Sequence, residues 1–115
     1  MVGLNKVSLI GNLGSDPDFQ TLDGNISVAK FSLATSEVFK DKNGEKHTVT
    51  EWHNIVLWRG LADLARKYLN KGSHVFIEGK LKTRSYEDKE GHKRYVTEII
   101  GDQLIILDKK EGDKS

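Results

Sequence analysis

The chain of 115 residues has no cysteine, a single proline and no long run of apolar residues. Without cysteine it can form no disulfide bond, thiol nucleophile, iron–sulfur cluster or cysteine-ligated zinc site. No window approaches the roughly 18 uninterrupted apolar residues that a membrane-spanning helix needs. The first residues also lack the apolar segment of a secretory signal peptide. We therefore expect a protein of a reducing compartment such as the cytoplasm.

The chain also lacks a strong net charge. Its formal net charge of +1 at pH 7 falls short of the basic excess typical of nucleic-acid-binding proteins. The charges are unevenly distributed, however, because residues 40–94 hold 13 basic and 8 acidic residues, a net charge of +5. Any basic surface of the folded protein should therefore come from this middle segment. Solvated hairpins rich in lysine would produce the same distribution.

Residues in a catalytic or metal-binding arrangement are not found. The four histidines form no His-x-His and no helical i, i+4 pair, and the acidic residues show no recognisable catalytic spacing. The chain also has no glycine-rich phosphate-binding motif. At this length we expect one domain, and we expect it to work by binding, without a metal ion, a cofactor or enzymatic activity.

Turn residues divide the chain into strands and one helix. Asn43-Gly44 is a hairpin signal, because these residues readily adopt the positive φ that tight turns require. From Gly60 the leucine, alanine and tyrosine residues recur with the spacing of an amphipathic helix of about ten residues. The remaining apolar segments alternate or are rich in β-branched and aromatic residues, which is typical of strands. The expected strands are residues 6–13, 26–39, 48–58, 73–86, 95–100 and 104–107.

The order of these elements favours one all-β architecture. A mainly antiparallel sheet with one short helix between its third and fourth strands is typical of the OB fold, a five-stranded Greek-key barrel. We predict such a domain over residues 1–108. Residues 109–115 are polar and are expected to form a disordered C-terminal remnant.

The strand predicted for residues 73–86 has two chemically different faces, because successive side chains of a strand point in opposite directions. Its odd positions are apolar or small and suit a core. Its even positions place Lys80, Lys82, Arg84 and Tyr86 on the other face. This second face is therefore a candidate for contact with a negatively charged ligand.

The strand predicted for residues 48–58 places both tryptophans of the chain on one face. Trp52 and Trp58 occupy even positions, opposite the aliphatic pair Ile55 and Leu57. Burial in a core is the simpler explanation for either ring alone. It would, however, require the aliphatic pair to face water or the strand to be buried on both sides. We therefore expect both tryptophans to be partly exposed.

Two further aromatic residues lie in charged hairpins, where a core position is unexpected. Phe39 precedes a hairpin rich in lysine, and Tyr86 lies between Arg84 and Glu87. Exposed rings can stack on nucleobases, which contributes about 1–3 kcal/mol per base without sequence readout. Neighbouring cations attract phosphates. The pattern predicts a site for single-stranded nucleic acid, because the bases of a duplex are already stacked on one another.

A series of short motifs occurs in order from about Leu4 to Leu107. They are Leu4-Asn5-Lys6-Val7, Gly11-Asn12-Leu13-Gly14, Leu33-Ala34-Thr35-Ser36-Glu37, Thr50-Glu51-Trp52-His53, Tyr68-Leu69, Ile77-Glu78-Gly79 and Arg94-Tyr95. Together they resemble the bacterial single-stranded DNA-binding protein family. The resemblance implies an OB fold, a homotetramer and binding of single-stranded DNA with little sequence preference, during replication, recombination and repair. It also implies a location in the cytoplasm, on the nucleoid.

The resemblance also implies which residues contact the DNA. Base stacking carries over to Phe39, Trp52, Trp58 and Tyr86. Phosphate contacts carry over to Lys40, Lys42, Lys71, Lys82, Arg84 and Arg94. We add Lys80, which shares the basic strand face, and Arg59, which borders Trp58.

One feature of the family is absent. Its members usually continue into a linker rich in Gly, Pro and Gln that ends in a short acidic tip, and this tip recruits replication and repair proteins. The given sequence ends at Ser115 without such a tip, so the resemblance does not by itself predict that these proteins are recruited. An OB-fold RNA binder and a protein–protein module that uses the aromatic face are alternative hypotheses. A nuclease is a third hypothesis, but this sequence lacks any acidic metal-binding arrangement that would support it.

Overall fold

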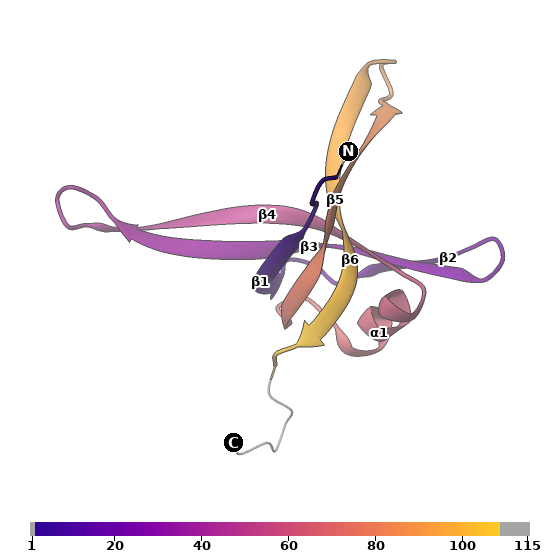
Figure 1. Ribbon diagram of the computed structural model, residues 1–115, viewed down its shortest axis with the longest axis horizontal. Helices are drawn as coiled ribbons and strands as arrows, with labels where there is room; N and C mark the ends of the chain where they lie inside the picture. Colours follow the sequence, from indigo (N-terminus) through magenta and orange to yellow (C-terminus); the bar gives the residue numbers. More distant parts are fainter. Residues whose placement is uncertain (1, 109–115) are drawn as a thin grey trace.

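A computed structural model describes residues 2–108 as a β-barrel with long projecting hairpins (Figure 1). The strands are β1 (Val7–Leu13), β2 (Asp18–Leu22), β3 (Ile26–Lys40), β4 (Lys46–Trp58), β5 (His74–Glu87) and β6 (Lys93–Ile106). The helix α1 (Gly60–Tyr68) lies between β4 and β5. The predicted disordered remnant, residues 109–115, lies outside the described residues.

Five of the strands close into a barrel in the order β1–β3–β4–β6–β5–β1. All neighbours in this order are antiparallel except β4 and β6, which are parallel. Strand β1 closes the barrel by pairing with β5 along most of its length and with β3 at Asn12 and Leu13. This order, with the helix between the third and fourth barrel strands, confirms the predicted OB fold.

The structure differs from the prediction in β2 and β6. Strand β2 lies outside the closed barrel and pairs with the first residues of β3. It was missed because its five residues alternate weakly and lie between two turn signals. The predicted strands 95–100 and 104–107 are one continuous strand, so dividing them at Gly101-Asp102 was wrong. Glu78 of β5 pairs with Gln103 and Gly79 pairs with Gly101, so Asp102 of β6 is left without a partner in the register. This extra residue forms a bulge and not a turn.

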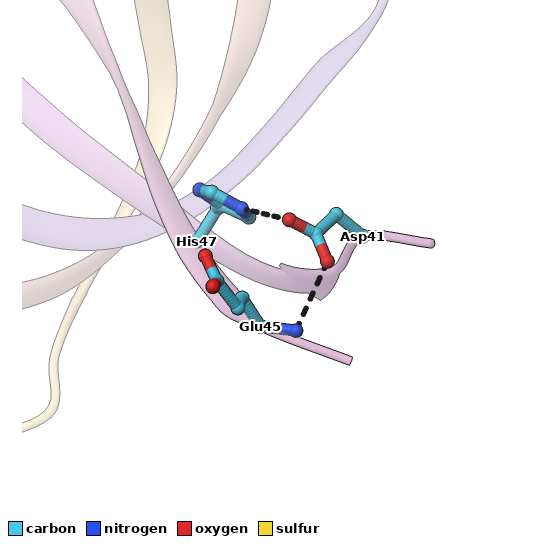
Figure 2. A group of neighbouring side chains, drawn as sticks. All are labelled: Asp41, Glu45 and His47. Carbon is cyan, nitrogen blue, oxygen red and sulfur yellow. Dashed lines mark hydrogen bonds and ion pairs between the residues drawn. The ribbon is translucent and has the colours of Figure 1, made fainter. Parts of the chain in front are cut away.

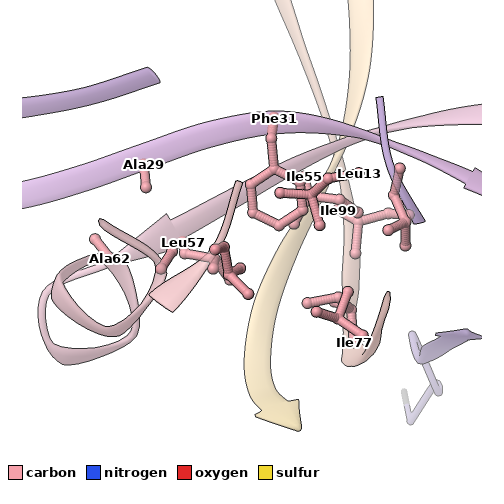
Figure 3. Close-up of a cluster of buried hydrophobic side chains, with 12 residues drawn as sticks. Leu13, Ala29, Phe31, Ile55, Leu57, Ala62, Ile77 and Ile99 are labelled. Atoms are coloured by element: carbon pink, nitrogen blue, oxygen red, sulfur yellow. The ribbon is translucent and has the colours of Figure 1, made fainter. Parts of the chain in front are cut away.

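Alternate residues of the barrel strands form the hydrophobic core (Figure 3). The largest fully buried side chains are Leu33, Ile55, Leu57, Val75 and Ile77. Helix α1 packs against β3, β4 and β6 and buries two alanines. Because the odd positions of β4 and β5 point inward, their even positions face the outside of the barrel. The two predicted faces are therefore confirmed within the barrel, as far as Gly79 of β5. Beyond it the prediction was wrong for the odd positions, because Leu81 is 48% exposed in the projecting hairpin.

The β3–β4 and β5–β6 hairpins extend well beyond the barrel in different directions (Figure 1). Their tips have no core to cover, so every residue from Ser36 to Glu51 and from Leu81 to Tyr95 is exposed or half-buried. Within residues 2–108, no helix has the length and apolar character needed to cross a membrane.

Candidate nucleic-acid interface

A groove on the outside of the barrel is lined by residues of β3, β4, β5 and β6. These are Lys30, Val56, Trp58, Lys80, Lys82, Arg84, Glu98 and Ile100. The groove thus brings together one predicted aromatic residue and three predicted cations from strands that are distant in sequence. It combines a flat apolar surface with positive charge, which are the two features that a single strand of nucleic acid requires.

Lys30 is a cation of the groove that the sequence analysis did not identify. It lies directly opposite Val56 in the β3–β4 register, and Val56 in turn neighbours Ile100 of β6. Its presence in the groove depends on this pairing. The one available signal was a lone lysine in an otherwise apolar part of the strand 26–39.

Glu98 lies buried in the groove and is paired with Arg84. The Arg84 Nε donates to Glu98 Oε1 at 2.9 Å, and Nη2 donates to Oε2 at 3.4 Å. This hydrogen bond, together with the attraction of the carboxylate, raises the pKa of Arg84. The charge of Arg84 is therefore balanced within the protein. Lys30, Lys80 and Lys82 make no ion pair with any residue of the 2–108 range.

Both tryptophans lie on the outer surface. Trp52 is 61% and Trp58 40% exposed, whereas Ile55 and Leu57 on the opposite face of β4 are completely buried. The prediction that both rings are partly exposed is confirmed, and the alternative that they fill the core is wrong. An exposed indole on a rigid strand is available to stack on a base.

The ring of Trp52 lies against Gly14, in the loop after β1. A Cβ atom added to Gly14 would lie only 2.3 Å from Cζ3 of Trp52, so only glycine leaves room for the ring in this position. The same loop is tied to the predicted phosphate contact Lys71. The backbone N–H of Lys71 donates to Asp16 Oδ1 at 2.7 Å. This hydrogen bond holds Lys71 beside the segment on which Trp52 rests.

The tip of the β3–β4 hairpin holds the predicted residues Phe39, Lys40 and Lys42. Phe39 is 50% exposed, and its ring stacks on His47 with 5.3 Å between the ring centroids and an angle of 24° between the planes. His47 is a residue that the sequence analysis did not assign to the site. It joins the site because it lies directly opposite Phe39 in the β3–β4 register.

Asp41 organises this turn (Figure 2). Its Oδ1 accepts the backbone N–H groups of Asn43 and Glu45, and its Oδ2 is hydrogen-bonded to His47 Nε2 at 2.7 Å. The bond to His47 and the backbone donors lower the pKa of Asp41. Ligand atoms of Asp41, Glu45 and His47 lie within 4.8 Å of one another, a grouping that the spacing in sequence did not predict. The hydrogen bonds of the turn account for this grouping.

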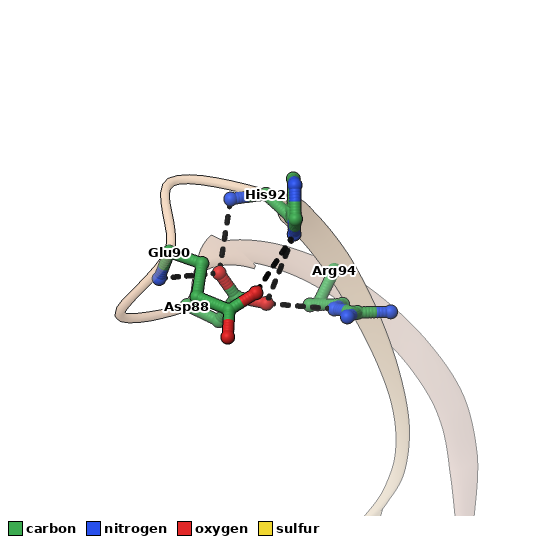
Figure 4. Close-up of polar contacts among 4 residues, drawn as sticks. All are labelled: Asp88, Glu90, His92 and Arg94. Atoms are coloured by element: carbon green, nitrogen blue, oxygen red, sulfur yellow. Dashed lines mark hydrogen bonds and ion pairs between the residues drawn. The ribbon is translucent and has the colours of Figure 1, made fainter.

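The tip of the β5–β6 hairpin holds Tyr86 and Arg94. Tyr86 is 47% exposed and lies directly opposite Arg94. The Nε of Arg94 donates to Asp88 Oδ2 at 2.9 Å, and this bond is the main reason that the pKa of Asp88 is lowered (Figure 4). The structure therefore places this predicted cation beside this predicted stacking residue.

Arg59 is the predicted residue with the weakest link to the others. It joins β4 to α1 with a positive φ of 57°, and its N–H donates to the carbonyl oxygen of Ser27. Only its position next to Trp58 in the sequence connects it to the groove. The other predicted residues fall into four groups: the groove, the surface around Trp52, and the two hairpin tips. An extended ligand could contact several of these groups, but a compact one could not.

Comparison with known proteins identifies the family of the chain. The model of the single-strand binding protein family matches residues 4–107. Single-stranded DNA-binding protein 1 of Xylella fastidiosa is 45% identical over 114 residues, which cover 98% of this chain and 84% of the relative. Single-stranded DNA-binding protein 1 of Chlorobaculum tepidum is 51% identical over 111 residues, which cover 96% of this chain and 68% of the relative.

Solved structures share the barrel. The Plasmodium falciparum SSB in complex with ssDNA superposes with a TM-score of 0.86 at 43% identity and covers 94% of this chain and 98% of that chain. A deletion mutant of the single-stranded DNA binding protein from Thermus aquaticus has a TM-score of 0.80 at 30% identity. The match covers 92% of this chain and 51% of that chain. These matches extend over nearly the whole described barrel, and the chain therefore belongs to the single-strand binding protein family.

Proposed function

We propose that this protein binds single-stranded DNA with little sequence preference, by stacking bases on exposed aromatic residues and pairing phosphates with lysine and arginine. The groove on the outside of the barrel is the observation that carries the proposal, because it places Trp58 beside Lys30, Lys80 and Lys82. Family membership and the resemblance to an SSB bound to ssDNA agree with it. Proteins of this family act by binding DNA, and this chain is accordingly not an enzyme.

The geometry accounts for the weak sequence preference. A strand that follows the groove from Trp58 toward Lys82 would meet a ring for its bases and ammonium groups for its phosphates. Every base has a π face, and phosphates are the same at every position, so neither contact reads sequence. The spread of Phe39, Trp52 and Tyr86 over separate surfaces suits a long strand that wraps around the protein.

Tryptophan fluorescence tests this function directly. Titration with a dT oligomer should quench the emission, because stacked bases lie against Trp52 and Trp58. Trp58→Ala should weaken binding by about 1–3 kcal/mol for each base that no longer stacks on a ring. Tyr68→Ala is a matched control, because Tyr68 is 55% exposed on α1 and lies outside the groove. Unchanged fluorescence at saturating dT would refute the stacking role, and stronger competition by rU oligomers would favour an RNA-binding function.

We further propose that the chain assembles into a homotetramer. Strand β1 pairs with β3 only at its last two residues, and Gly11 lies against the Ala34 carbonyl of β3, so the edge over residues 7–10 is open on that side. Ile10, Phe76 and Ile105 form an apolar row across β1, β5 and β6, and Ile10 is 57% exposed. A second copy of the chain would cover both the open edge and this row. Sedimentation equilibrium that shows only the 12.9 kDa monomer would overturn the proposal.

Roles in replication, recombination and repair, and a location on the nucleoid, are part of the same proposal. They follow from the places where single-stranded DNA is exposed in a cell. Imaging of a fluorescent fusion during replication tests them, and a distribution that ignores the DNA would contradict them.

A further inference from the structure

The tips of the two long hairpins share one sequence plan. Residues 39–47 read Phe-Lys-Asp-Lys-Asn-Gly-Glu-Lys-His, and residues 86–94 read Tyr-Glu-Asp-Lys-Glu-Gly-His-Lys-Arg. Each begins with an aromatic residue and has aspartate at its third position, lysine at its fourth and eighth, and glycine at its sixth. Each ends with a side chain that can be cationic. Among these corresponding positions, the ninth differs most in its chemistry. It is His47 in the first hairpin and Arg94 in the second.

The two tips also share their hydrogen bonds (Figures 2 and 4). Asp41 Oδ1 accepts the backbone N–H groups two and four residues later at 2.8 and 3.0 Å, and Asp88 Oδ1 does the same at 3.0 and 2.9 Å. Gly44 and Gly91 both have a positive φ, 78° and 81°, which glycine adopts without strain. The second carboxylate oxygen of each aspartate holds the ninth residue, at 2.7 Å from His47 and 2.9 Å from Arg94.

Each aspartate thereby positions a side chain beside an exposed ring. Phe39 lies opposite His47, and Tyr86 lies opposite Arg94, in the registers of the two hairpins. Both aromatic residues are about half exposed, 50% and 47%. The repeated unit is therefore a ring that can stack on a base and, next to it, a nitrogen-bearing group that can meet a phosphate. In the first hairpin the imidazole also stacks on Phe39 and enlarges the flat surface.

The protonation state decides what His47 offers to a ligand. Asp41 is ionised above acidic pH, since its pKa is lowered, and a carboxylate can only accept a hydrogen bond. The Nε2 atom of His47 must therefore carry a proton, which leaves Nδ1 of the neutral ring as an acceptor. A phosphate cannot pair with an acceptor. Protonation turns Nδ1 into a charged donor, and histidine is the side chain whose charge ordinarily changes between about pH 5 and 8.

The charged groups around His47 belong to its own hairpin. Asp41 holds Nε2, and the carboxylate of Glu45 lies in the same cluster. Lys40 and Lys46 face one another in the adjacent pair of the register. Figure 1 shows this tip projecting away from the barrel. The surroundings of the ring thus hold two acidic and two basic side chains.

We propose that each hairpin tip is one copy of the same nucleotide-binding unit, and that His47 is the counterpart of Arg94. His47 extends the stacking surface of Phe39 and, in its protonated form, adds a phosphate contact that Arg94 makes at every pH. The inference rests on the proposed binding of single-stranded DNA and adds to it a contact residue and a dependence on pH.

The test compares the salt dependence of dT binding at about pH 8 and about pH 6 in the wild type and three variants. Each phosphate neutralised on a single strand contributes about −0.7 to the slope of log K against log salt concentration. On going to the lower pH, the wild-type slope should become more negative by about 0.7 for each β3–β4 hairpin engaged. His47→Gln should abolish this change, and His47→Arg should show the steeper slope at both pH values. His74→Gln is the matched control, because His74 is the first residue of β5 and lies outside the groove and both hairpin tips, and it should behave as wild type.

Two results would overturn the inference. One is a His47→Gln protein that keeps the full wild-type change of slope with pH, because another group would then be titrating. The other is a His47→Arg protein whose slope at the higher pH equals that of wild type. Circular dichroism verifies that each variant is folded. A wild-type protein that fails to bind dT at either pH would instead refute the proposed function, so the two failures can be told apart.

Discussion

Replacing Glu98 with glutamine should strengthen DNA binding and make it more dependent on salt. In the wild-type groove, Arg84 donates two hydrogen bonds to the buried Glu98 carboxylate, at 2.9 and 3.4 Å. Its side chain is nevertheless 48% exposed, so it can reach a ligand. Glutamine keeps the size of the side chain and an oxygen acceptor for Arg84 but removes the negative charge. The substitution therefore frees the charge of Arg84 without removing the residue.

The size of the effect follows from the charges in the groove. Four cations and one carboxylate line it, a net charge of +3, and Glu98→Gln raises this to +4. If Arg84 then neutralises one further phosphate, the slope of log K against log salt should become more negative by about 0.7 for each subunit that binds the strand. Lys82→Ala measures how much one unpaired lysine of the groove contributes to the slope. Lys82 has no ion-pair partner within residues 2–108, so its removal should make the slope less negative by a similar amount.

The assay is fluorescence titration with a dT oligomer over a series of NaCl concentrations at about pH 8, above the range in which histidine ordinarily changes charge. The double variant Arg84→Met/Glu98→Gln serves as the control, because it removes the pair without leaving a buried carboxylate unpaired. It should return the slope to nearly the wild-type value. If Glu98→Gln alone leaves both affinity and slope unchanged while Lys82→Ala reduces them, Arg84 does not lie on the phosphate path, and the reasoning from charge balance is wrong.

Three further predictions follow from the contacts described above. Gly14→Ala should displace the Trp52 ring, because its Cβ would lie 2.3 Å from that ring, and should lower dT affinity and shift the tryptophan emission while the protein stays folded. Asp88→Asn should lower the melting temperature at neutral pH by removing the bond to Arg94. The pKa of Asp88 is depressed in the folded state, so this difference from wild type should be complete above the ordinary value of 3.8 and should vanish as the pH falls through the folded-state pKa. Ile77→Ala should reduce the free energy of unfolding by about 2–5 kcal/mol in a denaturant titration, since Ile77 is completely buried in the barrel; a much smaller reduction would contradict its place in the core.

Prediction from sequence succeeded where a feature depends on neighbouring residues. The bounds predicted for the strand 73–86 differ by one residue at each end from those of β5 (His74–Glu87). Its face of Lys80, Lys82 and Arg84 is confirmed as well, because alternation along a strand is a local property. The division of β6 at Gly101-Asp102 failed for the opposite reason. Whether a glycine ends a strand or forms a bulge depends on the partner strand, and here β5 continues past it.

The candidate site was predicted only in part for a similar reason. Trp52, Trp58, Phe39 and Tyr86 could be identified one at a time, from the face of a strand or the charge of a hairpin. Their distribution over a groove and two projecting tips could not, because it depends on how the strands cross in the barrel. The likeness between the two hairpin tips is visible in the sequence, but its meaning became clear only when both aspartates were seen to hold the residue opposite the ring.

The sequence alone determined the all-β class, the place of the helix, the inner and outer faces of β4 and β5 and the aromatic residues that face water. Each of these depends on periodicity or turn chemistry over a few residues. The tertiary structure alone decided that Lys30 enters the groove, that Glu98 balances Arg84 and that Gly14 supports Trp52. These contacts join residues that are far apart in the chain, and only the register of paired strands and the closure of the barrel bring their side chains together.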